Sequence, residues 1–185
     1  MKSFARVFAS AVLLITYVLV TPARQQEATP KQTQPKQTWK IARDYDKAKD
    51  RTKLELEPIP VTRVKDVRIL LGMQTYFAGE KPETPLDRFI FSLSFFTKSL
   101  EPFADSTLSL QVDGKPIDVG PMTFAGKVEL KDEIGLVYGI PLSGEELSKI
   151  ANARRVEMRI GNLQFMLREE QINAILDFRR QAMSK

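Results

Sequence analysis

From residue 50 onwards the chain repeats one pattern, in which apolar and polar residues alternate over a short run that ends at a turn. A period of two places every second side chain on the same face, so each run predicts a strand that buries one face in a core. Turn-forming residues separate the runs at spacings of about ten residues, which favours antiparallel strands. The predicted strands are 51–56, 67–78, 88–97, 108–112, 117–119, 124–130, 134–140, 156–160 and 163–167.

Proline, glycine and aromatic residues add detail to this pattern. Pro58 and Pro60 lack the backbone N–H that a central strand donates, so the first strand is expected to stop before them. Gly72 interrupts the run 67–78 and is a candidate β-bulge at which the strand bends. The run 88–97 is the most hydrophobic of the predicted strands, which predicts a central position in its sheet.

Two segments leave the period of two and predict helices. Ser143 followed by Glu146 forms a capping box, so a short helix should begin there and run to about Asn152. The segment 169–183 has acidic residues early and basic residues late, as the helix dipole prefers, and it is expected to cover an open end or an edge of the sheet. The residues expected on one side of this helix are Ile172, Ile175, Leu176, Arg179 and Met183.

These elements predict a single globular domain over 44–185, mainly β, with the fold of an antiparallel β-sandwich or barrel. It should contain about eight short strands, one short helix and one C-terminal helix. A chain of about 140 residues buries roughly two-thirds of its unfolded surface, so the domain needs no disulfide.

The first 23 residues match a secretory signal peptide. Lys2 and Arg6 precede the apolar run 7–20, and Thr21-Pro22-Ala23 supplies the small residues of a cleavage site. A membrane-spanning helix needs about 20 apolar residues, which is more than this run offers. We therefore expect export to the periplasm or the extracellular space after cleavage, and the alternative is an uncleaved anchor, residues 7–23, in the inner membrane.

Residues 24–43 form a polar tail rich in proline, glutamine, threonine and lysine, with the sequence PKQT at 30–33 and again at 35–38. A segment of this composition buries too little apolar surface to fold alone. It predicts a flexible linker, and the functional alternative is a cationic strip that touches an anionic polymer of the envelope.

The chain contains neither cysteine nor histidine. This excludes zinc, copper and iron sites built on thiolate or imidazole ligands, and catalysis by serine–histidine or cysteine–histidine pairs. The spacing of Asp44 and Asp46 matches the start of a calcium-binding loop. However, Ala48 and Lys49 stand where that loop requires an oxygen ligand and a glycine. No metal, cofactor or catalytic residue is predicted.

Paired carboxylates are the catalytic device that this composition leaves, because two facing acids can hydrolyse a glycosidic bond. The adjacent acids outside the last helix are Asp132 with Glu133 and Glu145 with Glu146. The first pair lies in a predicted hairpin turn and the second in the first turn of a predicted helix, so each has a structural explanation.

Four aromatic residues are candidates for ligand binding: Trp39, Tyr45, Tyr76 and Tyr138. Flat aromatic rings can stack on sugar rings, although aromatic residues in β-rich domains also fill the core. Trp39 stands where the tail meets the domain, so it could contact a ligand or anchor the end of the tail by packing.

A candidate interaction surface contains Arg155, Glu157 and Arg159, which share one strand face, and Arg179 and Arg180 near the end of the last helix. The alternative is a solvated sheet face with mixed charges. The formal net charge is +5, and Lys2 and Arg6 of the signal carry two of these charges. Nucleic acid is therefore not predicted as a partner.

The sequence favours by exclusion a non-enzymatic binding or structural module that is exported to the bacterial cell envelope and contacts another envelope protein. A second hypothesis is a carbohydrate-binding module, or a weak carboxylate-dependent hydrolase of glycans. A third is an anchored subunit of a membrane complex, if residues 7–23 are retained.

The signal hypothesis predicts that the exported protein begins at Arg24. Intact-mass spectrometry of the protein recovered from the envelope fraction measures this directly. A mass that includes residues 7–23 would instead establish the anchored form.

Overall fold

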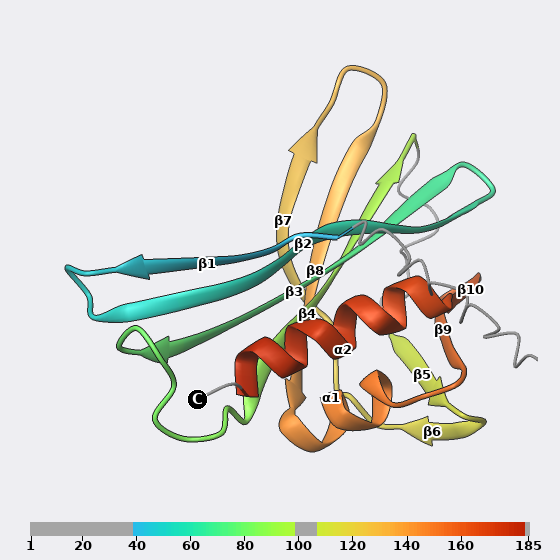
Figure 1. Cartoon of the computed structure of the whole chain (residues 1–185). Coiled ribbons are helices and arrows are strands. Elements are labelled where there is room, and N and C mark those ends of the chain that lie inside the picture. Colours follow the sequence, from blue (N-terminus) through green and yellow to red (C-terminus); the bar gives the residue numbers. More distant parts are fainter. Residues whose placement is uncertain (1–38, 99–106, 184–185) are drawn as a thin grey trace, which may run out of the picture. The chain divides into compact units, whose positions relative to one another are not determined.

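The computed structural model describes residues 39–98 and 107–183, and this part of the chain is mainly β with two helices (Figure 1). The predicted signal peptide and residues 24–38 of the predicted tail lie outside the described residues. The strands are β1 (Ile41–Asp46), β2 (Arg51–Val64), β3 (Val67–Ala78), β4 (Arg88–Thr97), β5 (Leu108–Val112), β6 (Lys115–Ile117), β7 (Thr123–Glu129), β8 (Ile134–Ser143), β9 (Val156–Ile160) and β10 (Leu163–Leu167). The helices are α1 (Gly144–Ala151) and α2 (Glu169–Met183).

The strands form two antiparallel sheets, which confirms the predicted fold class and makes it sandwich-like. Six strands follow the order β1-β2-β3-β4-β8-β7, and four follow the order β10-β9-β5-β6. The predicted hairpins are present, since β5 turns into β6 and β7 turns into β8. The described residues hold ten strands, more than the eight or so predicted.

β1 is the strand that the sequence pattern did not predict. It begins at Ile41, inside the stretch assigned to the tail, and pairs with β2 from Ile41 opposite Leu56 to Asp46 opposite Arg51. Its residues are half-buried or exposed and include three charges, so no clean alternation marks it. Pairing with β2 makes this segment a strand, and pairing is not visible in a local pattern.

β2 does not stop at its two prolines, which corrects the sequence prediction. It continues to Val64, and its pairing with β3 shifts register around Pro58 and again after Pro60. β1 accompanies β2 only as far as Leu56, so beyond that point β2 has no strand on this side among the described residues. At an edge or a bulge, the missing N–H of proline costs no ladder bond.

Gly72 serves close packing and does not form a bulge in its own strand. It lies in regular register opposite Ser92 of β4, and the irregularity belongs to β2. A Cβ at this position would lie 2.8 Å from the Ser92 hydroxyl oxygen and 3.4 Å from the carbonyl oxygen of Leu56. A side chain at this position would therefore require the Ser92 hydroxyl to move.

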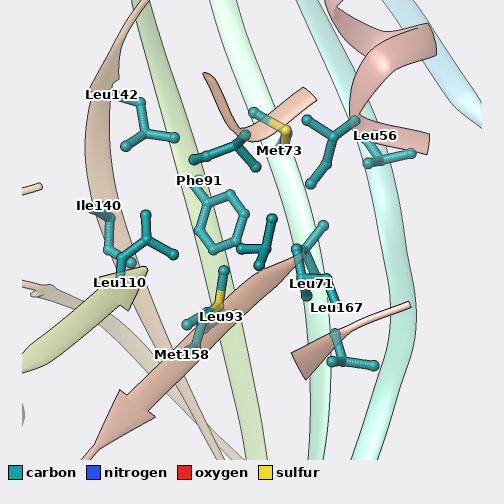
Figure 2. Packing of buried hydrophobic residues seen from close by; sticks show 14 of the residues in the cluster. Leu56, Leu71, Met73, Phe91, Leu93, Leu110, Ile140, Leu142, Met158 and Leu167 are labelled. Atoms are coloured by element: carbon teal, nitrogen blue, oxygen red, sulfur yellow. The ribbon is translucent and has the colours of Figure 1, made fainter. Parts of the chain in front are cut away.

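One hydrophobic core joins the two sheets (Figure 2). β4 lies between β3 and β8, as its apolar sequence predicted, and its side chains from Phe89 to Phe95 alternate into the core. Figure 2 shows β9 crossing the six-stranded sheet with Met158 beside Leu93, while Leu110 of β5 lies near Ile140. The smaller sheet therefore covers the centre of the larger one.

The capping box at the start of α1 is confirmed. The Ser143 hydroxyl accepts a hydrogen bond from the Glu146 backbone N–H at 3.2 Å, and the Glu146 carboxylate accepts one from the Ser143 N–H at 2.7 Å. The helix ends at Ala151 with Asn152 as its C-cap, close to the predicted end.

α2 has the predicted bounds, but its buried face is turned from the predicted one. Ile172 and Ile175 are buried as expected, whereas Phe178 takes the place expected for Arg179. Phe178 packs edge to face on Phe89, with ring centroids 6.3 Å apart. Two buried alanines, at 174 and 182, complete the face, and such small residues carry little hydrophobic signal. Neither helix of the described part combines the length and the apolar character that a membrane crossing requires.

Gln171 is the polar residue that connects α2 to the sheet. It is buried, its side-chain oxygen accepts a hydrogen bond from the Arg168 N–H at 2.7 Å, and its side-chain nitrogen donates to the carbonyl of Pro60 at 2.9 Å. The first bond caps the helix start. The second gives the Pro60 carbonyl, at the open edge of β2, a hydrogen-bond partner.

Replacing Gln171 by alanine should lower the free energy of unfolding by about 1–3 kcal/mol, because it leaves backbone groups without partners. Urea denaturation measures this loss. The matched control is Gln181→Ala on the exposed side of the same helix, which should change stability by less than about 0.5 kcal/mol. Equal losses in the two variants would contradict the role given to Gln171.

Surface ion pairs shift several pKa values of the described residues away from neutrality. The pKa of each of Asp46, Glu129 and Glu145 is lowered, chiefly because each carboxylate accepts a hydrogen bond from a nearby lysine. The pKa of Lys40 is raised, chiefly because it donates a hydrogen bond to Glu57. An acid whose pKa is lowered by folding contributes stability above its ordinary pKa. That contribution is lost as the pH falls through its pKa in the folded state. A lysine whose pKa is raised by folding contributes stability at pH values below its ordinary pKa of 10.5. It loses this contribution as the pH rises through its pKa in the folded state.

Neither of these windows includes neutral pH, and the chain has no histidine to titrate there. The free energy of unfolding should therefore change by less than about 1 kcal/mol between pH 6 and pH 8. Urea unfolding at pH 6, 7 and 8 tests this expectation. A larger change would reveal a group with a strongly shifted pKa.

Candidate functional site

The four aromatic candidates do not form one platform. Trp39 is partly buried and packs against the core. Tyr45 lies opposite Thr52, a buried residue, whereas Tyr76 lies opposite Lys53 on the other face of the sheet. Tyr138 is also packed against the core, on β8, several strands away. Sugar stacking by all four rings together is therefore excluded.

Tyr76 is the exposed member of this set, with 38% of its surface accessible. It lines a groove of about 580 Å³, called here the tyrosine groove, together with Arg51, Asp87 and Arg88. The Arg51 guanidinium lies 4.1 Å from the centre of the Tyr76 ring, so a cation already covers part of the ring. Asp87 is the one acid that lines this groove among the described residues, and its carboxylate accepts a bond from the Gly144 N–H at 3.2 Å.

Three of the four adjacent acids, Glu133, Glu145 and Glu146, have structural partners. Glu133 accepts a hydrogen bond from Arg68 at 3.0 Å, and Glu145 forms an ion pair with Lys149 at 2.7 Å. Glu146 caps α1. Within the two described ranges, no cluster of three or more acidic residues could hold a metal ion. The pairs thus have the turn and helix roles that the sequence suggested.

Glu157 and Arg159 of β9, and Arg155 directly before this strand, lie on its outer face, away from the core. The buried residues of β9 are the alternate ones, beginning with Val156, so the three charged side chains point outwards. β5 and β10 flank β9 and extend this face with uncharged polar residues such as Ser109, Gln111 and Gln164. A hollow of about 190 Å³ lies among these side chains.

A larger groove of about 560 Å³ begins where this face ends, and Gln164 lines both hollows. Arg154, Arg155 and Arg168 line it, and we call it the arginine groove. Thr62 and Val64, from the end of β2, form part of its lining. No carboxylate belongs to the described lining, so the groove is cationic.

Backbone hydrogen bonds position the three arginines. The Asp113 carboxylate, in the turn between β5 and β6, accepts bonds from the N–H groups of Arg154 and Arg155 at 3.0 and 2.9 Å. Arg168 precedes α2, and its N–H donates to Gln171. Each arginine is therefore attached to backbone that the fold holds in place.

The side chains around the groove leave positive charge and apolar surface accessible. Arg155 forms an ion pair with Glu157 at 2.5 Å, which neutralises one guanidinium at the rim of the groove. Met166 also lines the groove, and 51% of its surface is accessible. Arginine and methionine are both enriched in protein–protein interfaces.

The structure separates the two groups of arginines that the sequence proposed. Arg179 and Arg180 lie near the end of α2, about 16 Å along the helix from Arg168 at its start. Arg180 pairs with Asp177 at 3.4 Å. These two residues do not belong to the arginine groove.

The sequence missed Arg154 and Arg168 as members of a site. Both lie outside the alternating strand residues, and the contact that makes them line a groove is the approach of β10 to β2, two strands of different sheets. The available signal was the arginine pair 154–155 directly before a predicted strand.

This surface is therefore a groove lined by three arginines, with no carboxylate in its described lining. Comparison of the chain with protein-family models, with curated proteins and with solved structures finds no match in any of the three.

Proposed function

We propose that this protein is a non-enzymatic binding module, exported to the bacterial cell envelope, that contacts another protein through the arginine groove. The partner segment is acidic and carries at least one apolar side chain. The observation that carries the proposal is a groove of about 560 Å³ lined by three arginines and an exposed methionine, with no carboxylate in its described lining.

The chemistry of the groove favours carboxylates as its ligand. Guanidinium groups bind carboxylates through two parallel hydrogen bonds, which gives direction as well as charge. Asp113 and Gln171 hold the backbone of Arg154 and Arg168, so the backbone at these positions needs little ordering on binding. Met166 offers a flexible apolar contact next to these charges.

The amino-terminal part of the chain supports the export component of the proposal. A signal peptide brings the domain out of the cytoplasm, and the polar tail after it acts as a spacer. About 15 residues of flexible chain span roughly 20 Å on average, enough to hold a domain away from a surface. If residues 7–23 are retained, the same domain and groove serve as an anchored subunit of a membrane complex.

A second candidate function is carbohydrate binding at the tyrosine groove. The specific observation in its favour is that Tyr76, the exposed tyrosine, lies in a groove of about 580 Å³ with charged residues at its edge. Hydrolysis is not proposed, because Asp87 has no second acid facing it in the described lining.

The proposal predicts that the natural protein captures a stoichiometric protein partner from envelope extract and that the double variant Arg154→Ala/Arg168→Ala loses it. Loss of two charge-assisted contacts should weaken binding at least about tenfold. The matched control is Arg180→Ala, which removes an exposed arginine far from the groove and should leave capture unchanged. Capture should also weaken as salt is raised.

Two results would contradict the proposal. One is capture that Arg180→Ala weakens as much as the groove variant does. The other is retention on envelope polysaccharide, with no captured protein, that Tyr76→Ala abolishes. The second result would establish carbohydrate binding in its place.

A further inference from the structure

β7 forms an open edge of the six-stranded sheet. It pairs with β8 on one side, and no described strand pairs with its other side. None of its seven residues is buried. Among the described residues, five large hydrophobic side chains are exposed, and three of them, Phe124, Val128 and Leu130, lie on or directly after β7. Figure 1 shows the β7–β8 hairpin extending away from the two helices.

The backbone groups that face the open edge can be assigned from one hydrogen bond. The Leu130 N–H donates to the Glu133 carbonyl at 2.9 Å, so Leu130 points towards β8. Backbone groups alternate in direction along an antiparallel strand. Lys127 and Glu129 therefore direct their N–H and C=O groups outwards, where they are available to another strand.

The side chains of this segment divide between the two faces of the sheet. Lys127 lies opposite Leu136, a core residue, and Glu129 shares that face and pairs with Lys127 at 2.7 Å. Val128 lies on the other face, opposite Gly135. Leu130 follows two positions later and shares the face of Val128.

We propose that β7 pairs antiparallel with β7 of a second copy of this chain, about a two-fold axis at Val128. In this register Lys127 of each copy lies opposite Glu129 of the other, and the two residues exchange both backbone hydrogen bonds. An axis at Lys127 or at Glu129 would place like charges directly opposite, which is destabilising. The charges of this segment thus favour the axis at Val128 over the axes at its two neighbours.

The apolar face is complementary in the same register. Val128 meets Val128 of the second copy, beside Gly135, where a Cβ would lie 3.4 Å from the Cβ of Val128 and 2.9 Å from the Phe96 ring. Leu130 lies opposite Gly126 of the second copy. A Cβ at Gly126 would have nothing within 4 Å, so there is room for the leucine side chain.

The contact is short, because β7 carries a register shift between Phe124 and Gly126 that ends regular pairing. Pairing over 126–130 buries less than the roughly 1,600 Å² of a standard stable interface. The dimer is therefore weak and depends on protein concentration. The dimer contact lies at the β7 edge of the sheet, whereas β2 and the arginine groove lie near the other edge. Dimer formation therefore does not require the protein partner proposed for the groove.

The absence of cysteine allows a direct test of the register in the full chain. In the proposed dimer the two Val128 Cα atoms lie about 4.5 Å apart, within the range that a disulfide bridges. Val128→Cys should therefore form a disulfide-linked dimer under mild oxidation. The matched control is Leu130→Cys, which is equally exposed at 46% but lies about 14 Å from its own copy in this register and should stay monomeric.

Charge variants test the same register in the Val128→Cys background. Lys127→Glu or Glu129→Lys alone should slow cross-linking about tenfold, because each places like charges opposite one another. The double variant Lys127→Glu/Glu129→Lys should restore the rate, and so should a mixture of the two single variants. Equal cross-linking of Val128→Cys and Leu130→Cys, or no cross-linking of either, would overturn the proposal. So would single charge variants that cross-link as fast as the parent.

Discussion

The apolar inner face of β4 is the constraint on which the rest of the described structure depends. From Phe89 to Phe95 its alternate residues are buried, and they contact the smaller sheet, β8 and α2. The four-stranded sheet has short strands that bury one face, so it requires the larger sheet as a partner. Burying the two faces against each other supplies most of the hydrophobic stabilisation.

The two proposed binding surfaces lie at the rim of this core. The arginine groove forms where β10 approaches the end of β2, and Gln171 contributes both to the start of α2 and to the edge of β2. One buried side chain thus connects the stability of the fold with the position of Arg168. The β7 edge lies at the other end of the strand order, so a partner in the groove and a second copy at the edge do not compete for the same strand.

The composition restricts what these surfaces can do. Without cysteine or histidine, the chain has neither a thiolate nor an imidazole to bind a metal, and it has no ordinary proton carrier at neutral pH. Of the adjacent acids, Glu145 pairs with a lysine, Glu133 accepts a hydrogen bond from an arginine, and Glu146 caps a helix. The described surface offers guanidinium groups, exposed apolar side chains and an unpaired strand edge, and both proposals use these features.

The sequence by itself determined most of the local structure, because alternation, turn residues and a capping box act over a few neighbouring positions. The bounds of β3, β4 and α2 follow from such signals, as does the fold class. Tertiary structure alone decided β1, the passage of β2 through two prolines, and the face of α2 that packs on Phe89. It also brought Arg154 and Arg168 into one groove and kept the four aromatic candidates apart. The physical reason is that pairing across a sheet and packing between sheets join residues far apart in the chain, and no local pattern records which partner a half-buried segment will meet.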